Sequence, residues 1–111
     1  MSLIANTPKP PYFAVIFTSV RTEGDNGYSD MANKMVELAK QQPGFLGMES
    51  AREDIGITVS YWADLDSNKN WKMNTEHLDA QKAGRKFWYD AFKVRISKVE
   101  RDYDIDGKSN G

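Results

Sequence analysis

The segment that decides the fold is YFAVIFTSVR, residues Tyr12–Arg21. From Tyr12 to Phe17 it is apolar at nearly every position, and it is rich in the β-branched and aromatic residues that favour strands. A strand with one face in water alternates apolar and polar residues, whereas a strand covered on both faces does not. We therefore expect a first strand that is buried on both faces.

A helix is expected after this strand. The turn residues TEGDNG (22–27) come first, and then YSDMANKMVELAKQQ (28–42) places apolar side chains at helical spacing: Tyr28, Met31, Met35, Leu38 and Ala39. Ser29 or Asp30 is the predicted N-cap, and Pro43 with Gly44 ends the helix.

The rest of the chain predicts a hairpin, a second helical region and a last strand. FLGMESARE (45–53) and GITVSYWAD (56–64) flank a short turn around residues 54–56. DLDSNKNWKMN (64–74) begins the second helical region, with Asp66 or Ser67 as its cap. Thr75 offers another cap, so we expect a break near Asn74. AFKVRISKVERDY (91–103) is a strand with Phe92, Val94 and Ile96 on one face.

The order β-α-β-β-α-β predicts an α+β, ferredoxin-like fold: a four-stranded antiparallel sheet with two helices on one face. The helices leave the other face of an apolar strand uncovered, and a second copy of the sheet is the simplest cover, so we expect a homodimer. Residues 1–11, with Pro8, Pro10 and Pro11, form an extended N-terminal arm, residues 12–103 the domain, and residues 104–111 a flexible tail.

Composition narrows the classes of partner. The chain has 111 residues, which fits one domain, and its 15 basic and 16 acidic residues give a net charge of −1. No basic excess favours nucleic acid or an anionic membrane surface. With no cysteine and one histidine, a transition-metal site is not expected. No signal peptide and no apolar run of about 18 residues stands out, which favours a cytoplasmic protein.

One stretch, NWKMNTEHLDAQKAGRKFWY (70–89), holds the candidate site. Counted at about 100° per residue from His77 to Tyr89, one third of the helical circle collects the mostly apolar residues His77, Ala80, Gln81, Gly84, Phe87 and Trp88. Gly84 costs about 1 kcal/mol relative to alanine in a helix. It therefore indicates either close packing of the helix on the sheet or a pocket.

In the pocket interpretation His77 is catalytic, and the substrate-binding residues are Trp62, Trp71, Gln81, Gly84, Arg85 and Trp88. Arg85, at the flank of the arc, would reach an anionic substrate. In the alternative interpretation Gly84 is closely packed, His77 bonds to backbone, and the tryptophans belong to the core.

Three segments together resemble the antibiotic biosynthesis monooxygenase family, and the resemblance extends over residues 12–103. They are GFLGMESARE (44–53), ITVSYWADLDSNKNW (57–71) and EHLDAQKAGRKFWYDAFKVRISKVER (76–101). The resemblance implies a dimeric α+β barrel with two sheets face to face, and a ligand cleft between helices and sheet in each subunit. The well-studied members of the family oxidise polycyclic aromatic phenols with dioxygen and without metal or flavin, so the resemblance implies this type of oxidation.

Three functions follow from the residues and the resemblance. The first is a cofactor-independent monooxygenase acting on an aromatic, quinol-like small molecule, with His77 as base. The second is a non-catalytic dimer that binds a small molecule in the same pocket. The third is a haem-binding or haem-degrading protein. The haem-degrading branch of the superfamily uses an Asn–Trp–His triad. Its tryptophan matches Trp71, but Gln81 stands at the histidine position, and the asparagine falls near Phe17 or Thr18.

Overall fold

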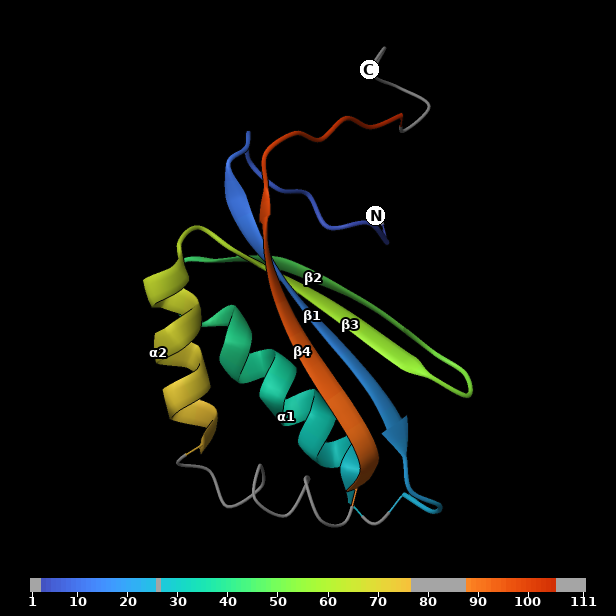
Figure 1. The fold of residues 1–111 in the computed structure, drawn as a ribbon. Coiled ribbons are helices and arrows are strands. Elements are labelled where there is room, and N and C mark those ends of the chain that lie inside the picture. The colour runs from blue at the N-terminus through green and yellow to red at the C-terminus, as the bar shows by residue number, and fades with distance from the viewer. Residues whose placement is uncertain (1–2, 26, 77–87, 106–111) are drawn as a thin grey trace.

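The computed structural model describes residues 3–25, 27–76 and 88–105, and side chains within these ranges except those of residues 74–76 (Figure 1). Its elements follow in the order β1 (Tyr12–Arg21), α1 (Tyr28–Lys40), β2 (Phe45–Arg52), β3 (Gly56–Trp62), α2 (Leu65–Glu76) and β4 (Tyr89–Val99). The predicted β-α-β-β-α-β order is confirmed.

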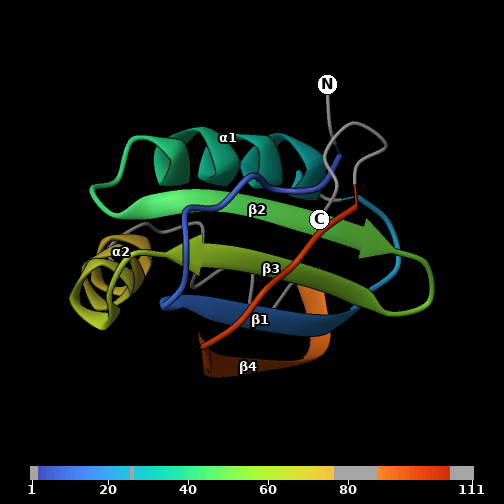
Figure 2. The same ribbon diagram turned by 90° about the horizontal axis from the view of Figure 1, so that it is seen from above.

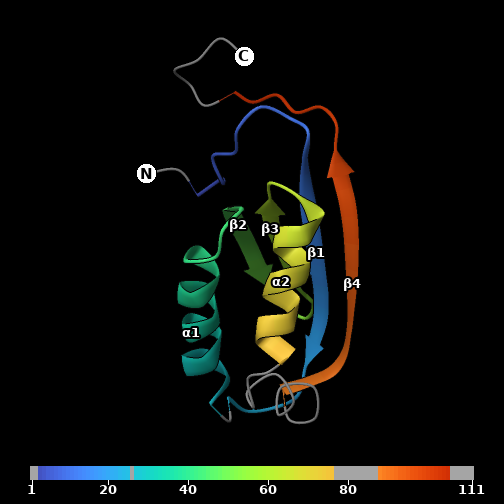
Figure 3. The same cartoon turned by 90° about the vertical axis from the view of Figure 1, so that its left-hand side faces the viewer.

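The sheet is antiparallel, with the strand order β2-β3-β1-β4. β1 is central and pairs with both β3 and β4, so that Val15 lies between Ser60 and Ile96. Both helices lie on the same side of the sheet, with α1 beside β2 and α2 beside β3 (Figure 3). This is the ferredoxin-like arrangement expected from the sequence.

The two faces of the sheet carry different residues of β1. Directly paired residues of neighbouring strands point to the same face, and successive residues alternate. Phe13 pairs with Trp62, whose ring stacks on Trp71 of α2, so this pair marks the helix-side face. That face also carries Val15, Phe17 and Ser19 of β1. The opposite face, here called the outer face, carries Tyr12, Ala14, Ile16, Thr18 and Val20.

The expected helix caps were wrong, because each helix begins before its expected cap and takes its capping carboxylate from the preceding loop. α1 follows Gly27, which adopts φ 84°, and the Ser29 N–H donates to Asp25 Oδ1 at 3.2 Å. In α2 the Ser67 N–H donates to Asp64 Oδ1 at 2.7 Å. Hydrogen bonds from the Ser29 hydroxyl and N–H lower the pKa of Asp25, and the bond from the Ser67 N–H lowers that of Asp64.

The expected break near Asn74 was also wrong, since α2 continues through Asn74 and Thr75 to Glu76. Asn74 and Thr75 are tolerated inside a helix, where their propensities differ from that of alanine by well under about 1 kcal/mol. Tyr89, counted above as helical, is the first residue of β4 and pairs with Arg21. Neither α1 nor α2 has the length and apolar character required to cross a membrane.

Both faces of the sheet are incompletely covered. Among the described residues, the buried apolar side chains are Tyr12, Ala14, Ala39 and Trp62. On the outer face Val20 is 41% exposed and Ile57 42%. On the helix-side face of β4, 40–55% of the surface of Phe92, Val94 and Ile96 is exposed. The sheet thus presents apolar surface that another element or another chain would have to cover.

The N-terminal arm crosses the outer face at one end of the sheet (Figure 2). The Ala5 N–H donates to Glu49 Oε2 of β2 at 2.9 Å, and the Tyr61 hydroxyl of β3 donates to Oε1 of the same carboxylate at 2.7 Å. The Tyr12 ring meets the Tyr61 ring edge to face at 5.8 Å, and its hydroxyl donates to Asp102 beyond β4. Segments from both ends of the chain are therefore fixed to the outer face.

We expect Trp62→Ala to lower the free energy of unfolding by about 3–5 kcal/mol, because the ring is fully buried and its removal leaves a cavity beneath α2. Urea unfolding followed by circular dichroism measures the change. The matched control is Tyr103→Ala, at a ring that is 88% exposed, which should shift stability by no more than about 0.5 kcal/mol. Equal losses in the two variants would contradict this assignment of the core.

Candidate functional site

The helix-side face carries two separate groups of aromatic rings. The first, here called the tryptophan cluster, consists of Trp62, Trp71 and Phe45. Trp62 stacks on Trp71 with 6.3 Å between ring centroids and meets Phe45 edge to face at 5.4 Å. The indole N–H of Trp62 donates to Ser60 Oγ at 2.9 Å, so its polar atom is satisfied inside the protein. Trp71 is partly exposed and is supported from behind by Trp62.

The second group, here called the tyrosine cluster, joins α1, β1 and the start of β4. Its rings are those of Phe17, Tyr28, Trp88, Tyr89 and Phe92, with neighbouring centroids 5.4–6.0 Å apart. The Arg21 guanidinium lies over the Tyr28 ring, 3.6 Å from its centroid, and Arg21 Nε donates to the Trp88 carbonyl at 2.9 Å. Arg21 therefore holds the start of β4 against the start of α1.

The two clusters lie at opposite ends of the sheet. Trp62 pairs with Phe13, and Tyr89 pairs with Arg21, eight residues further along β1. At about 3.3 Å per residue this is a separation of roughly 26 Å along the strand. The structure thus brings Trp62 and Trp71 together and places Trp88 in the other cluster, beside Tyr28.

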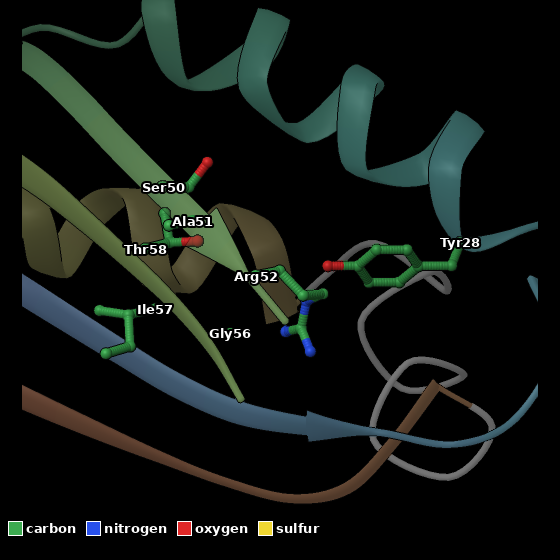
Figure 4. Close-up of a pocket in the computed structure, with 7 residues that line it drawn as sticks. All are labelled: Tyr28, Ser50, Ala51, Arg52, Gly56, Ile57 and Thr58. Atoms are coloured by element: carbon green, nitrogen blue, oxygen red, sulfur yellow. The ribbon is translucent and has the colours of Figure 1, made fainter. Parts of the chain in front are cut away.

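A cavity of about 270 Å³ opens beside the tyrosine cluster, between the start of α1 and the hairpin end of β2 and β3 (Figure 4). Its walls come from three elements: Tyr28 of α1, Ser50, Ala51 and Arg52 of β2, and Gly56, Ile57 and Thr58 of β3. The Tyr28 side chain extends from α1 toward Arg52, with its hydroxyl directed into the space between them. The wall combines one aromatic ring, aliphatic groups, hydroxyl groups and one guanidinium.

Arg52 is fixed by its neighbours on β1 and β3. Its Nη2 donates to the hydroxyl of Ser19, a side chain that is 1% exposed. Gly56 lies directly opposite Arg52 in the sheet, and a Cβ at Gly56 would overlap the guanidinium. The absence of a side chain at Gly56 therefore lets Arg52 lie across β3 and reach β1.

The environment of the tyrosine cluster also changes the acidity of the Tyr89 phenol. Burial raises the pKa of Tyr89 well above its ordinary value, and the neighbouring Tyr28 hydroxyl raises it further. The positive charges of Arg52 and Arg21 act in the opposite direction but do not cancel the effect. Tyr89 is neutral at physiological pH, as any tyrosine is, and its raised pKa keeps it neutral further into alkali.

Four of the predicted site residues, His77, Gln81, Gly84 and Arg85, lie outside the described residues. Their roles, and the substrate contacts predicted for the three tryptophans, stay predictions. Phe17, one of the two residues near which the asparagine of the haem-degrading scheme would fall, packs against Tyr89 and Phe92 in the tyrosine cluster. In the described part of the chain, no three His, Cys, Asp or Glu side chains are grouped to hold a metal ion.

Sequence reasoning missed the cavity residues Tyr28, Arg52 and Gly56. Tyr28 was expected as part of the apolar stripe of a helix, and Arg52 was expected as the end of a strand. The pairing of Arg52 with Gly56 follows from the hairpin register, which the short turn around residues 54–56 predicts. The contact with Ser19 depends on the order of β2, β3 and β1 in the sheet, and the sequence indicates it less directly.

Known proteins share both sequence and fold with this chain. The pattern that defines the antibiotic biosynthesis monooxygenase family matches residues 11–83. YqjZ of Bacillus subtilis strain 168, an uncharacterized protein, is 52% identical over 103 residues, which is 91% of this chain and 90% of YqjZ.

Solved structures show the same fold at low sequence identity. SnoaB from Streptomyces nogalater, a cofactor-independent oxygenase, superposes with a TM-score of 0.71 at 12% identity, covering 84% of this chain and 97% of SnoaB. PA3566 from Pseudomonas aeruginosa superposes with a TM-score of 0.64 at 16% identity, covering 86% and 99%.

We expect the protein to lose stability in alkali, partly through Tyr89. Its raised pKa means that the folded chain keeps a proton that the unfolded chain releases above about pH 10, the ordinary tyrosine value. The stabilising contribution is complete below that pH and is lost as the pH rises through the folded value. Urea unfolding at a series of pH values between roughly 8 and 12 measures this slope.

Tyr89→Phe should make the decrease of the unfolding free energy with alkaline pH shallower, because phenylalanine has no titrating proton in either the folded or the unfolded chain. Tyr12 and Tyr61 also have raised pKa values through burial, so part of the slope should remain. Tyr103→Phe is the matched control at an exposed ring. A slope that Tyr89→Phe leaves unchanged would contradict the assignment.

Proposed function

Since the chain belongs to the antibiotic biosynthesis monooxygenase family, we propose that it is a cofactor-independent monooxygenase that oxidises a small aromatic, quinol-like molecule with dioxygen. The observation that carries the proposal is the cavity on the helix side of the sheet, bounded by the Tyr28 ring and by hydroxyl groups. Partly apolar cavities with a few polar groups are typical of small-molecule sites. The fold shared with SnoaB agrees with such a site.

The proposed reaction needs no external reductant. A quinol that takes up one oxygen atom and becomes a hydroxyquinone supplies all four electrons that reduce dioxygen, and the second oxygen atom leaves as water. The protein's task is to bind the ring away from water, remove a proton so that the electron-rich anion forms, and stabilise that anion. These are tasks for side chains rather than for a metal or flavin.

We assign the roles as follows. His77 removes the proton, since an unperturbed imidazole titrates near pH 6.5 and so acts as a base at neutral pH. Gln81 and the ring of Trp88 orient the substrate, Gly84 leaves it room, and Arg85 balances its negative charge. The predicted contacts of Trp62 and Trp71 would lie at the other end of the sheet, too far along β1 for the same small substrate. The described contacts support unequal parts for the tryptophans: Trp62 is fully buried and supports Trp71, whereas Trp71 and Trp88 retain exposed surface.

We further propose that the active form is a homodimer in which two outer faces pack together. The exposed apolar side chains of Val20 and Ile57 on this face support the proposal, as does the small number of fully buried apolar residues in the described part of the chain. Burying such surface is the main driving force for association.

For the reaction, we expect the purified protein to consume dioxygen with one or more members of a panel of phenols and quinols, at one dioxygen per substrate molecule. His77→Ala should lower kcat by about a hundredfold or more, as expected for loss of a general base. An oxygen electrode and product mass spectrometry give both readouts. Full turnover in His77→Ala would remove the base assignment, and binding without turnover would favour a non-catalytic small-molecule-binding dimer.

For the dimer, we expect a mass in solution of about twice 12.6 kDa by light scattering. Ile57→Lys places a charge on the outer face and should shift the protein toward the monomer. The matched control is Ile96→Lys on the helix-side face of β4, where the side chain is 55% exposed, and it should leave the mass unchanged. A strictly monomeric native protein would overturn the dimer.

A further inference from the structure

We infer that Arg52 is the anion anchor of the cavity and binds the carboxylate of a single-ring aromatic ligand, an assignment that rests on the proposed function for the aromatic class of the ligand. Arg52 lines the cavity at the end of β2, and the Tyr28 ring lies across the cavity from it (Figure 4). The site is distinct from Arg85, the cation expected from the sequence.

The guanidinium is held in place before any ligand arrives. Ser19 accepts a hydrogen bond from Nη2, and this hydroxyl is almost fully buried in the central strand. The space above Gly56 is filled by the guanidinium itself. A cation fixed in this way loses less conformational freedom on binding than an ordinary surface arginine does, and this favours affinity.

The positive charge of Arg52 is not balanced within the described part of the chain. No described carboxylate forms an ion pair with it, and the cavity wall contains no acidic residue. Glu53 and Asp54 belong to the adjacent turn and do not line the cavity. Arg21, the other cation of this region, donates to the backbone carbonyls of Trp88, Gly24 and Asp25. Arg52 is thus the cation at this cavity that remains open to an anion.

The shape and chemistry of the cavity define the ligand. A guanidinium has five N–H donors in a planar fork, and a carboxylate accepts two of them in parallel. After the bond to Ser19, donors remain for such a pair. A cavity of about 150 Å³ accepts benzene, so about 270 Å³ is enough for one substituted ring. The lining residues Tyr28, Ser50 and Thr58 each carry a hydroxyl group that can bond a ring hydroxyl.

The test compares two probes with the same ring. Gentisate is a hydroquinone that carries one carboxylate, and hydroquinone itself is neutral. Affinities for both are measured by isothermal titration calorimetry on the intact protein. We expect wild type to bind gentisate about tenfold more tightly than hydroquinone, as for one charge-assisted bond, and to lose part of this preference at high salt.

Two variants separate the charge from its position. Arg52→Gln removes the charge, and Gly56→Ala keeps it but displaces the guanidinium from Ser19. Both should reduce the gentisate-to-hydroquinone affinity ratio to about one, whereas Arg101→Gln, an equal change of charge on an exposed residue beyond β4, should keep it. Circular dichroism confirms that each variant is folded.

A wild-type ratio near one, or a ratio that Arg52→Gln leaves intact, would overturn the anchor. Neither result would contradict the proposed oxidation, because dioxygen consumption with neutral quinols is measured separately. Conversely, if no quinol is oxidised but the gentisate preference depends on Arg52, the anion site stands and the monooxygenase function falls.

Discussion

The fold depends on the pairing of β1 with two neighbouring strands, β3 and β4. β3 contributes a ladder from Phe13 to Ser19 and β4 one from Tyr12 to Arg21, so the central strand is paired on both sides from Phe13 to Ser19. This pairing fixes which residues share a face. It brings Ser19 next to Gly56 and Phe17 next to Val94, and from these neighbours both the arginine site and the tyrosine cluster arise.

Most of the architecture could be predicted from local patterns. The limits of β1 were predicted to the residue, because a continuous apolar run between prolines and turn residues leaves little choice. The caps were harder. Several Asp and Ser residues stand near each helix start, and the backbone of the preceding loop decides which carboxylate reaches the free N–H groups. Asp25 and Asp64 have this role because Gly27 and the end of β3 bring the chain back toward the helix.

The site was less predictable for a related reason. Helical periodicity draws attention to residues of one element, and it singled out the arc around His77. The cavity beside the tyrosine cluster is built from three elements, and hydrophobic periodicity does not predict the roles of two of its residues, Arg52 and Gly56. In the sequence, Arg52 looks like an ordinary polar residue near the end of a strand, and Gly56 looks like an ordinary turn residue. Their meaning depends on register and strand order, which are long-range properties of the sheet.

The arm across the outer face bears on how the molecule can be handled. Glu49 accepts bonds from Ala5 and Tyr61, and Tyr12 is tied to Asp102, so the segments that lead to both chain ends leave from the same rim of the sheet. An affinity tag or a fused fluorescent protein at either end would therefore follow segments that leave the sheet at the Tyr12 end of β1, whereas the apolar side chains of Val20 and Ile57 lie toward the other end of that strand. An insertion at the exposed hairpin turn next to Ile55 would instead lie beside Ile57, so the two chain ends are the better points of attachment when that surface must stay accessible.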